Sequence, residues 1–167
     1  MAIPYRGTTS RSTYFLTAGA FNKTHILQSE RMAELFCEIL FRYRDAGKFQ
    51  IHAFVVMPNH IHLLLTVPEG MMLERTMQLI KGGFSYEAGK QFGVRGTIWQ
   101  KSYVDRRVRD AVECFRFREY IHQNPVRAGL VSAQKEFACS SASERFRLDE
   151  LPQRLKPEHL NTPVMHR

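Results

Sequence analysis

Two strongly apolar segments, FQIHAFVVM and HIHLLLTV, are separated by only two residues, Pro58 and Asn59. Residues 49–57 and 60–67 have the length and the apolar content of buried β-strands. A Pro-Asn pair is typical of a tight turn, so the two strands are predicted to form an antiparallel hairpin. Pro68-Glu69-Gly70 ends the second strand. The chain is therefore predicted to contain a β-sheet.

The rest of the chain supplies alternating strands and helices around this hairpin. The predicted elements are a strand at 13–18, a helix at 29–45 capped by Ser29, a helix at 71–88 weakened by Gly82 and Gly83, a strand or strand plus loop at 97–108, and a helix at 110–123 that Pro125 must end. The order β-α-β-β-α-β-α predicts an α+β sandwich, an antiparallel sheet with helices on one face.

Length and charge limit the classes of protein to which this chain can belong. Its 167 residues, with 44% apolar and 24% charged residues, are typical of one soluble globular domain. Lys and Arg exceed Asp and Glu by 24 to 16, which gives a formal net charge of +8. This excess favours a polyanionic partner, with nucleic acid first and an acidic membrane surface second.

The sequence favours a cytoplasmic location. No apolar run approaches the roughly 18 residues that a membrane span requires, and the N-terminal residues lack the apolar stretch of a signal peptide. Cys37, Cys114 and Cys139 are odd in number and far apart, without CxxC spacing. We therefore expect reduced, structural thiols.

His60 and His62 are the first candidates for a functional site. Residues two apart in a strand point to the same face, so both imidazoles share one face. Residues on the opposite face are expected in the core; they are Ile61, Leu63, Leu65 and Val67. A paired-imidazole face suits a divalent metal. Two half-buried histidines that hydrogen-bond nearby carbonyls would show the same spacing, and the spacing leaves both interpretations open.

The helix within RFREYIHQNPVRAGL offers a second set of polar side chains. Arg116 and Asn124 lie one turn before and after Tyr120, and Glu113 is close on the same stripe. The neighbouring apolar stripe, which would pack on the sheet, contains Cys114, Phe117 and Ile121. Tyr120 and Asn124 can face one metal from this position. Equally, Tyr120 can be a residue at the edge of the core and Asn124 a residue at the helix C-terminus.

Three blocks in this order, VVMPNHIHLLLTVPEG, IWQKSYVDRRVRD and EYIHQNPVRAGLV, carry a resemblance to a known family. The chain resembles the single-tyrosine, histidine-hydrophobe-histidine (HUH) transposases, which are IS200-like, and in particular the branch associated with repetitive extragenic palindromes (REP). The similarity extends over residues 10–145. The first and last blocks together are specific, whereas either alone is only suggestive.

The resemblance implies a ferredoxin-like (RRM-like) fold for residues 1–145, followed by a tail at 146–167 that is partly ordered or wraps the domain. It also implies that His60, His62 and Asn124 bind Mg²⁺ or Mn²⁺ and that Tyr120 is the nucleophile. One departure from the family pattern lies at Ala138-Cys139, where an aromatic residue is expected before the serine pair. This departure puts the docking of the tail in question.

The function implied by the resemblance is that of a metal-dependent single-stranded DNA endonuclease and strand transferase. It would act near hairpins or palindromic repeats through a 5′-phosphotyrosine intermediate, as a monomer or a homodimer. A positively charged group of side chains next to the tyrosine helix would contact phosphates; it consists of Lys101, Arg106, Arg107, Arg109 and Arg127.

Two other functions compete with this one. The first is a non-catalytic module that binds single-stranded nucleic acid on the same fold. The second, a zinc hydrolase that uses the histidine pair, lacks an HExxH motif and an evident carboxylate base.

Overall fold

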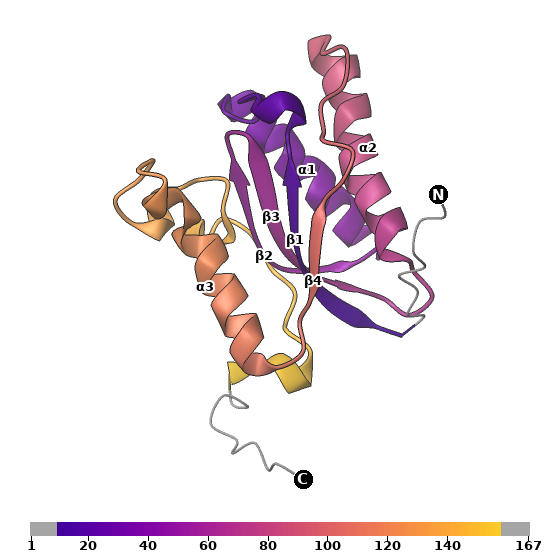
Figure 1. The fold of residues 1–167 in the computed structure, drawn as a ribbon, viewed down its shortest axis with the longest axis vertical. Coiled ribbons are helices and arrows are strands. Elements are labelled where there is room, and N and C mark those ends of the chain that lie inside the picture. The colour runs from indigo at the N-terminus through magenta and orange to yellow at the C-terminus, as the bar shows by residue number, and fades with distance from the viewer. Residues whose placement is uncertain (1–9, 158–167) are drawn as a thin grey trace.

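The computed structural model describes residues 10–157 and has a four-stranded antiparallel sheet at its centre (Figure 1). The strands are β1 (Ser12–Gly19), β2 (Gln50–Met57), β3 (His60–Val67) and β4 (Val104–Arg107), and their order in the sheet is β2-β3-β1-β4. Every neighbouring pair is antiparallel. The predicted hairpin is therefore confirmed, and β1 inserts between its second strand and β4.

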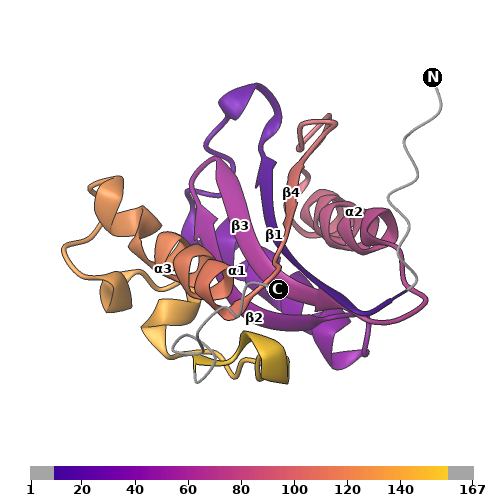
Figure 2. The ribbon, with the colours of Figure 1, turned by 60° about the horizontal axis from the view of Figure 1, so that its bottom comes forward.

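Of the three α-helices in the described part of the chain, two lie on one face of this sheet and one on the other (Figures 1 and 2). They are α1 (Glu30–Asp45), α2 (Leu73–Phe92) and α3 (Ala111–Arg127). The predicted α+β class and antiparallel sheet are confirmed. The expected placement of the helices on one face holds for α1 and α2, whereas α3 lies on the opposite face. The reason is that the apolar β2 and β3 are buried on both faces and need cover on each.

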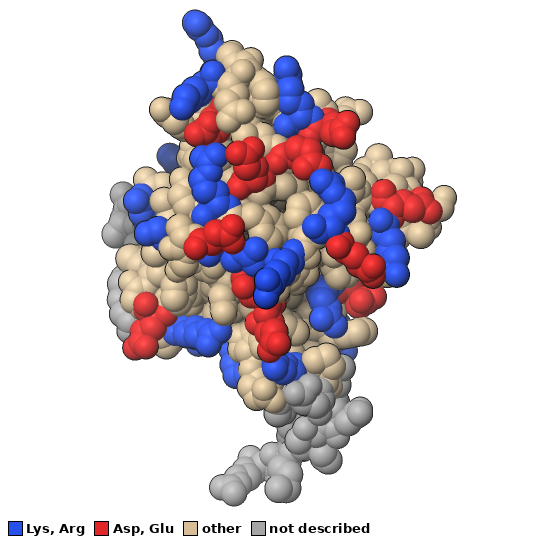
Figure 3. Space-filling model, turned by 180° about the vertical axis from the view of Figure 1, so that it is seen from behind, with Lys and Arg blue, Asp and Glu red and all other residues tan. Residues whose placement is uncertain are grey.

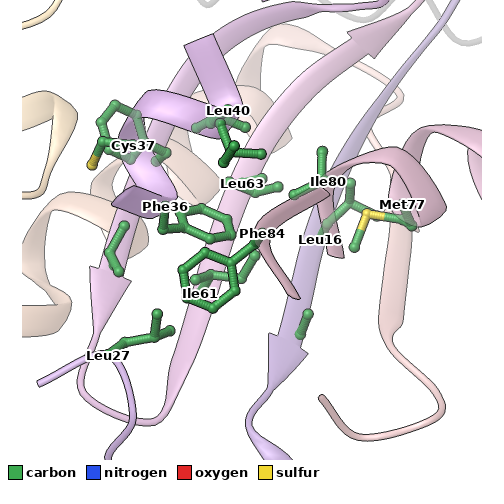
Figure 4. Close-up of a cluster of buried hydrophobic side chains, with 14 of the residues drawn as sticks. Leu16, Leu27, Phe36, Cys37, Leu40, Ile61, Leu63, Met77, Ile80 and Phe84 are labelled. Carbon is green, nitrogen blue, oxygen red and sulfur yellow. The ribbon is translucent and has the colours of Figure 1, made fainter. Parts of the chain in front are cut away.

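The larger core lies between the sheet and the helices α1 and α2. Figure 4 shows side chains from both helices, among them Phe36 and Phe84, meeting Ile61 and Leu63 of β3. The predicted core face of β3 is confirmed, because all four of its apolar residues are buried in this cluster. The smaller core lies under α3 and includes Leu64.

Helix α2 continues through both of its central glycines. It ends at Gly93, whose φ of 67° is the left-handed conformation that ends many helices. Gly83 is needed for packing, because a Cβ there would lie 2.7 Å from the ring of Tyr43 on α1. A Cβ on Gly82 would meet nothing within 4 Å. The helix therefore extends to Phe92, beyond the predicted end at residue 88.

The prediction that Pro125 ends the last helix is wrong, because α3 runs on to Arg127 with Pro125 inside it. A proline in the final turn removes only one intrahelical hydrogen bond, and the residue is buried. The helix closes after it, where the Ala128 N–H donates to the Asn124 carbonyl at 3.0 Å. Asn124 therefore stays on the helix, one turn beyond Tyr120.

The segment that follows α3 docks along the outer edge of β2 despite its missing aromatic. The Val56 N–H donates to the carbonyl of Cys139 at 2.9 Å. Further on, Phe146 stacks on Phe41 with ring centroids 5.2 Å apart and meets Phe54 edge-on at 4.9 Å. Within residues 146–157 the chain thus returns across the domain, and Leu155 is buried in the smaller core.

Two features bear on the environment of the chain. The three cysteines are buried and unbridged, as expected for structural thiols. Within residues 10–157, no helix combines the length and the apolar character that crossing a bilayer demands.

Candidate active site

His60 and His62 lie at the beginning of β3, on the face of the sheet that α3 covers. The register pairs Gly19 with His60 and Thr17 with His62, so these residues share one face. The two imidazole rings are 4.8 Å apart between centroids. His62 is buried and His60 is half-buried. The prediction that both histidine side chains point away from the larger core is confirmed.

Neighbouring polar groups orient both imidazoles through their Nδ1 atoms. Thr17 Oγ1 lies 2.8 Å from Nδ1 of His62, and Asn59 Oδ1 lies 2.7 Å from Nδ1 of His60. Each ring is therefore left with Nε2 for another partner. Nε2 of His62 is buried and has no hydrogen-bond partner among the described residues. Thr17 and Asn59 were not predicted from the sequence, although Asn59 lies inside the PNHIH motif.

Both histidines are held in the neutral form that binds metals. Burial, together with a smaller effect of the nearby His60, lowers the pKa of His62 to about 3. Burial also lowers the pKa of His60, an effect opposed by a hydrogen bond with the Asn124 side chain. A neutral imidazole keeps a nitrogen lone pair for a ligand over a wide range of pH.

Tyr120 is brought to the histidines by the packing of α3. Its ring centroid lies 5.2 Å from that of His62, and the side chain is 40% exposed. Phe15 of β1 holds the arrangement, because it stacks on His62 at 5.5 Å and meets Tyr120 edge-on at 5.9 Å. Phe117 stacks on the same ring at 4.6 Å, which fixes the rotation of α3. Phe15 was not singled out from the sequence, since its contacts are all made in tertiary structure.

Two further side chains of α3 complete the group. Asn124 hydrogen-bonds to His60, so the carboxamide lies next to the imidazole pair. The guanidinium carbon of Arg127 lies 5.5 Å from the centroid of the Tyr120 ring. A phenolic hydroxyl, two imidazoles, a carboxamide and a fixed positive charge therefore meet at one place.

The residues present fit a divalent metal. His60 and His62 present neutral imidazoles, the Nε2 atom of His62 lacks a partner among the described residues, and Asn124 adds a carboxamide oxygen. In the described part of the chain there is no cluster of three or more His, Cys, Asp or Glu residues that could hold a metal. Any cation in this site would therefore be held by two imidazoles and a neutral oxygen.

The predicted basic group is divided by the sheet register. Arg106 pairs with Phe15 and lies on the face of Tyr120, whereas Arg107 pairs with Tyr14 and faces the side of α1 and α2. Arg109 forms an ion pair with Glu113, with 2.8 Å between Nη2 and Oε1, at the far end of α3.

Lys101 is exposed beside a hollow next to α2. On the side that is turned away in Figure 1, basic and acidic side chains alternate (Figure 3). Of the five basic residues, the structure brings Arg127 to the site and puts Arg106 on the same face of the sheet.

Comparison with known proteins places this site in a family. The model of the IS200-like transposase family matches residues 8–124. The REP-associated tyrosine transposase of Escherichia coli is 28% identical over 130 residues, which cover 77% of this chain and 75% of that protein. A Haemophilus influenzae protein provisionally given the same name is 26% identical over 156 residues, with 83% and 88% covered.

A solved structure, described as a REP-associated tyrosine transposase bound to a REP hairpin, has the same fold. It superposes with a TM-score of 0.71 at 22% identity and covers 93% of this chain and 94% of that one. The family match extends over more than half of the chain and contains both histidines, Tyr120 and Asn124. The chain belongs to the IS200-like transposases, as its sequence motifs implied.

Proposed function

We propose that this transposase is a metal-dependent endonuclease and strand transferase for single-stranded DNA. It cuts near hairpins or palindromic repeats and keeps the 5′ end as a phosphotyrosine on Tyr120. The observation that carries the proposal is the meeting of Tyr120 with His62, at 5.2 Å between ring centroids, beside an imidazole nitrogen that has no partner among the described residues. The hairpin substrate is taken from the names of the relatives.

His60, His62 and Asn124 would hold Mg²⁺ or Mn²⁺. Such an ion, when bound, polarises a non-bridging phosphate oxygen and reduces the charge that repels a nucleophile. Thr17 and Asn59 hydrogen-bond to the Nδ1 atoms, which leaves Nε2 of each imidazole directed to the ion. These ligands are uncharged, so they leave the positive charge of the site for the phosphate.

Tyr120 performs the displacement. Its phenolic oxygen attacks phosphorus, the bond between phosphorus and the 3′ oxygen breaks, and the phenolic proton ends on that 3′ oxygen. The products are a 5′-phosphotyrosyl strand and a free 3′-OH, with no change in the number of phosphodiester-type bonds. The guanidinium of Arg127, next to the ring, stabilises the negative charge that develops on the phenolic oxygen and the phosphate.

The covalent intermediate suits transfer better than hydrolysis. A 3′-OH, either the one released or one from another strand, can attack the phosphotyrosine and restore a phosphodiester without ATP. Phe15 and Phe117 hold the tyrosine ring from one side, while 40% of the side chain stays exposed for the incoming strand. The site is thus rigid behind the nucleophile and open in front of it.

The proposal is tested by covalent capture of DNA. A hairpin-flanked single strand, labelled at its 3′ end and incubated with Mn²⁺, should give a protein–DNA adduct that survives denaturing electrophoresis. Tyr120→Phe should abolish the adduct and leave DNA affinity within about twofold, and chelation by EDTA should also abolish it. Tyr86→Phe, at a tyrosine of α2 that is 67% exposed, is the matched control and should react normally.

Adducts that persist in Tyr120→Phe would refute the assignment of the nucleophile. Tight binding of such strands without any adduct, in the wild-type chain with Mn²⁺ or Mg²⁺, would instead support the non-catalytic binding module. Analytical ultracentrifugation of the complex decides whether the acting species is a monomer or a homodimer.

A further inference from the structure

A cavity of about 340 Å³ opens directly beside His60. Its walls come from the end of β1, the turn between β2 and β3, and the segment before β4; they consist of Gly19, Ala20, Lys23, Asn59, His60 and Gln100. The volume lies at the lower end of the range for small-ligand sites, about 300–1,000 Å³. His60 belongs both to this cavity and to the candidate metal site, so a ligand here would touch the reacting centre.

Main-chain hydrogen bonds build the walls of this cavity. The Ala20 N–H donates to the carbonyl of Asn59 at 2.8 Å, and the Gln100 N–H donates to the carbonyl of Gly19 at 2.9 Å. The ammonium of Lys81 donates to the carbonyl of Gln100 at 2.8 Å. Three segments distant in sequence are therefore fastened together, and the cavity is preformed.

Gly19 leaves the space that the Gln100 carboxamide fills. Gly19 pairs with His60, so a Cβ on Gly19 would point to the same face as the imidazole. That Cβ would lie 3.0 Å from Oε1 of Gln100 and 3.2 Å from its Cδ. The carboxamide thus lies over the strand, next to His60. No described residue hydrogen-bonds to it, so its donor and acceptor are available.

Lys23 supplies the charge of the cavity. It is the one charged side chain in the lining, and no carboxylate accompanies it. The backbone at Asn22 and Lys23 is left-handed, with φ of 54° and 55°, a conformation that costs energy in residues other than glycine. The cavity therefore combines one cation, an unengaged carboxamide and a shared edge with the candidate metal site.

This combination matches one nucleotide of a DNA strand. A carboxamide forms paired hydrogen bonds with a base edge, best with N6 and N7 of adenine. An ammonium group binds a phosphate as a point charge. We infer that this cavity, which we call the flanking-base pocket, holds the nucleotide adjacent to the scissile phosphate, with Gln100 against the base and Lys23 against its phosphate. The inference rests on the proposed function and names a substrate subsite for it.

The experiment measures base preference in binding, without cleavage. In a Tyr120→Phe background, fluorescence anisotropy follows the binding of oligothymidylate strands that carry a single dA, dG or dC at successive positions beside a hairpin. We expect one position with a base preference of about tenfold, the size of one good base-edge contact. Gln100→Ala should reduce that preference to near unity. Gly19→Ala should do the same by displacing the carboxamide, because its backbone conformation accepts alanine.

Lys23 is tested through the salt dependence of affinity in the same background. Lys23→Met should reduce the slope of log K against log salt concentration by about 0.7, the value for one phosphate on a single strand. Lys48→Met removes an equal charge at the opposite end of the sheet and should leave the slope unchanged. Equal slopes in the two variants overturn the role of Lys23.

Absence of any base preference in the parent protein, or a preference that survives both Gln100→Ala and Gly19→Ala, overturns the flanking-base pocket. Failure of the proposed function has a different signature. In that case the wild-type chain forms no covalent adduct, while the base preference and its loss in these variants remain.

Discussion

Ser141 offers a quantitative test of how the tyrosine helix is held on the sheet. The Phe54 N–H of β2 donates to Ser141 Oγ at 3.0 Å, and the Ser141 hydroxyl donates to the Phe54 carbonyl at 3.2 Å. Nε2 of His122, two residues beyond Tyr120 on α3, lies 2.8 Å from the same oxygen. Because the one hydroxyl hydrogen is already used, His122 is the donor in this last bond. One side chain therefore joins β2, α3 and the segment after α3.

The expected cost of Ser141→Ala follows from what the change leaves unpaired. The Phe54 N–H is fully buried and would lose its partner, which costs about 1–3 kcal/mol. His122 borders a cavity of about 230 Å³ that can admit water, so its N–H adds little. The free energy of unfolding should therefore fall by about 1–3 kcal/mol, with Phe54 as the main cause.

The matched control is Ser143→Ala, two residues on. The single hydroxyl hydrogen of Ser143 is shared between the carbonyls of Ala138 and Ser140, which lie 3.1 and 2.8 Å from Oγ, and within residues 10–157 this side chain bonds to no helix or strand of the sheet domain. Its removal should cost about 0.5 kcal/mol or less. Urea unfolding followed by circular dichroism gives both values, and amide hydrogen exchange should show faster exchange at Phe54 only in Ser141→Ala. Equal losses in the two variants would refute the reasoning.

Three more predictions follow from burial, register and packing. Burial lowers the pKa of His52, so on acidification this imidazole is protonated first in the unfolded chain. The free energy of unfolding should therefore fall as the pH drops below about 6.5. Unfolding measured across pH should show a weaker dependence of this free energy on pH in His52→Asn. Arg106→Ala should weaken single-stranded DNA binding and its salt dependence in a filter-binding assay, whereas Arg107→Ala, on the other face, should change neither; equal effects would contradict the register argument. Gly82→Ala should raise the free energy of unfolding by about 1 kcal/mol. Gly83→Ala should be about 1–3 kcal/mol less stable than Gly82→Ala, because its Cβ meets the ring of Tyr43 on α1. Equal melting temperatures of the two variants would exclude this clash.

The parts of the site that were predicted well from the sequence are those that follow from local periodicity. His60 and His62 are two apart in a strand, and Tyr120 and Asn124 are four apart in a helix. These spacings put each pair on one face whatever surrounds the element. The side-chain partners that orient the histidines could not be predicted in this way. Thr17 reaches His62 only because β1 inserts beside β3, and no local pattern marks it.

The end of the last helix and the faces of two arginines could not be predicted from local sequence rules. Pro125 predicts the end of a helix, but its burial and the loss of only one hydrogen bond let α3 continue. Arg106 and Arg107 look equivalent in the sequence. Their separation onto two faces follows from the pairing of β4 with β1, a contact between residues about ninety positions apart.

The sequence by itself determined the elements, the shared face of the two histidines and the family to which the chain belongs. These properties depend on short-range spacing and on motifs that are read along the chain. Only the tertiary structure decided that α3 covers the second face of the sheet and brings Tyr120 to His62, and that a cavity opens beside His60. The physical reason is that strand order and register set which residues meet across the sheet, and both are determined by the packing of the whole core.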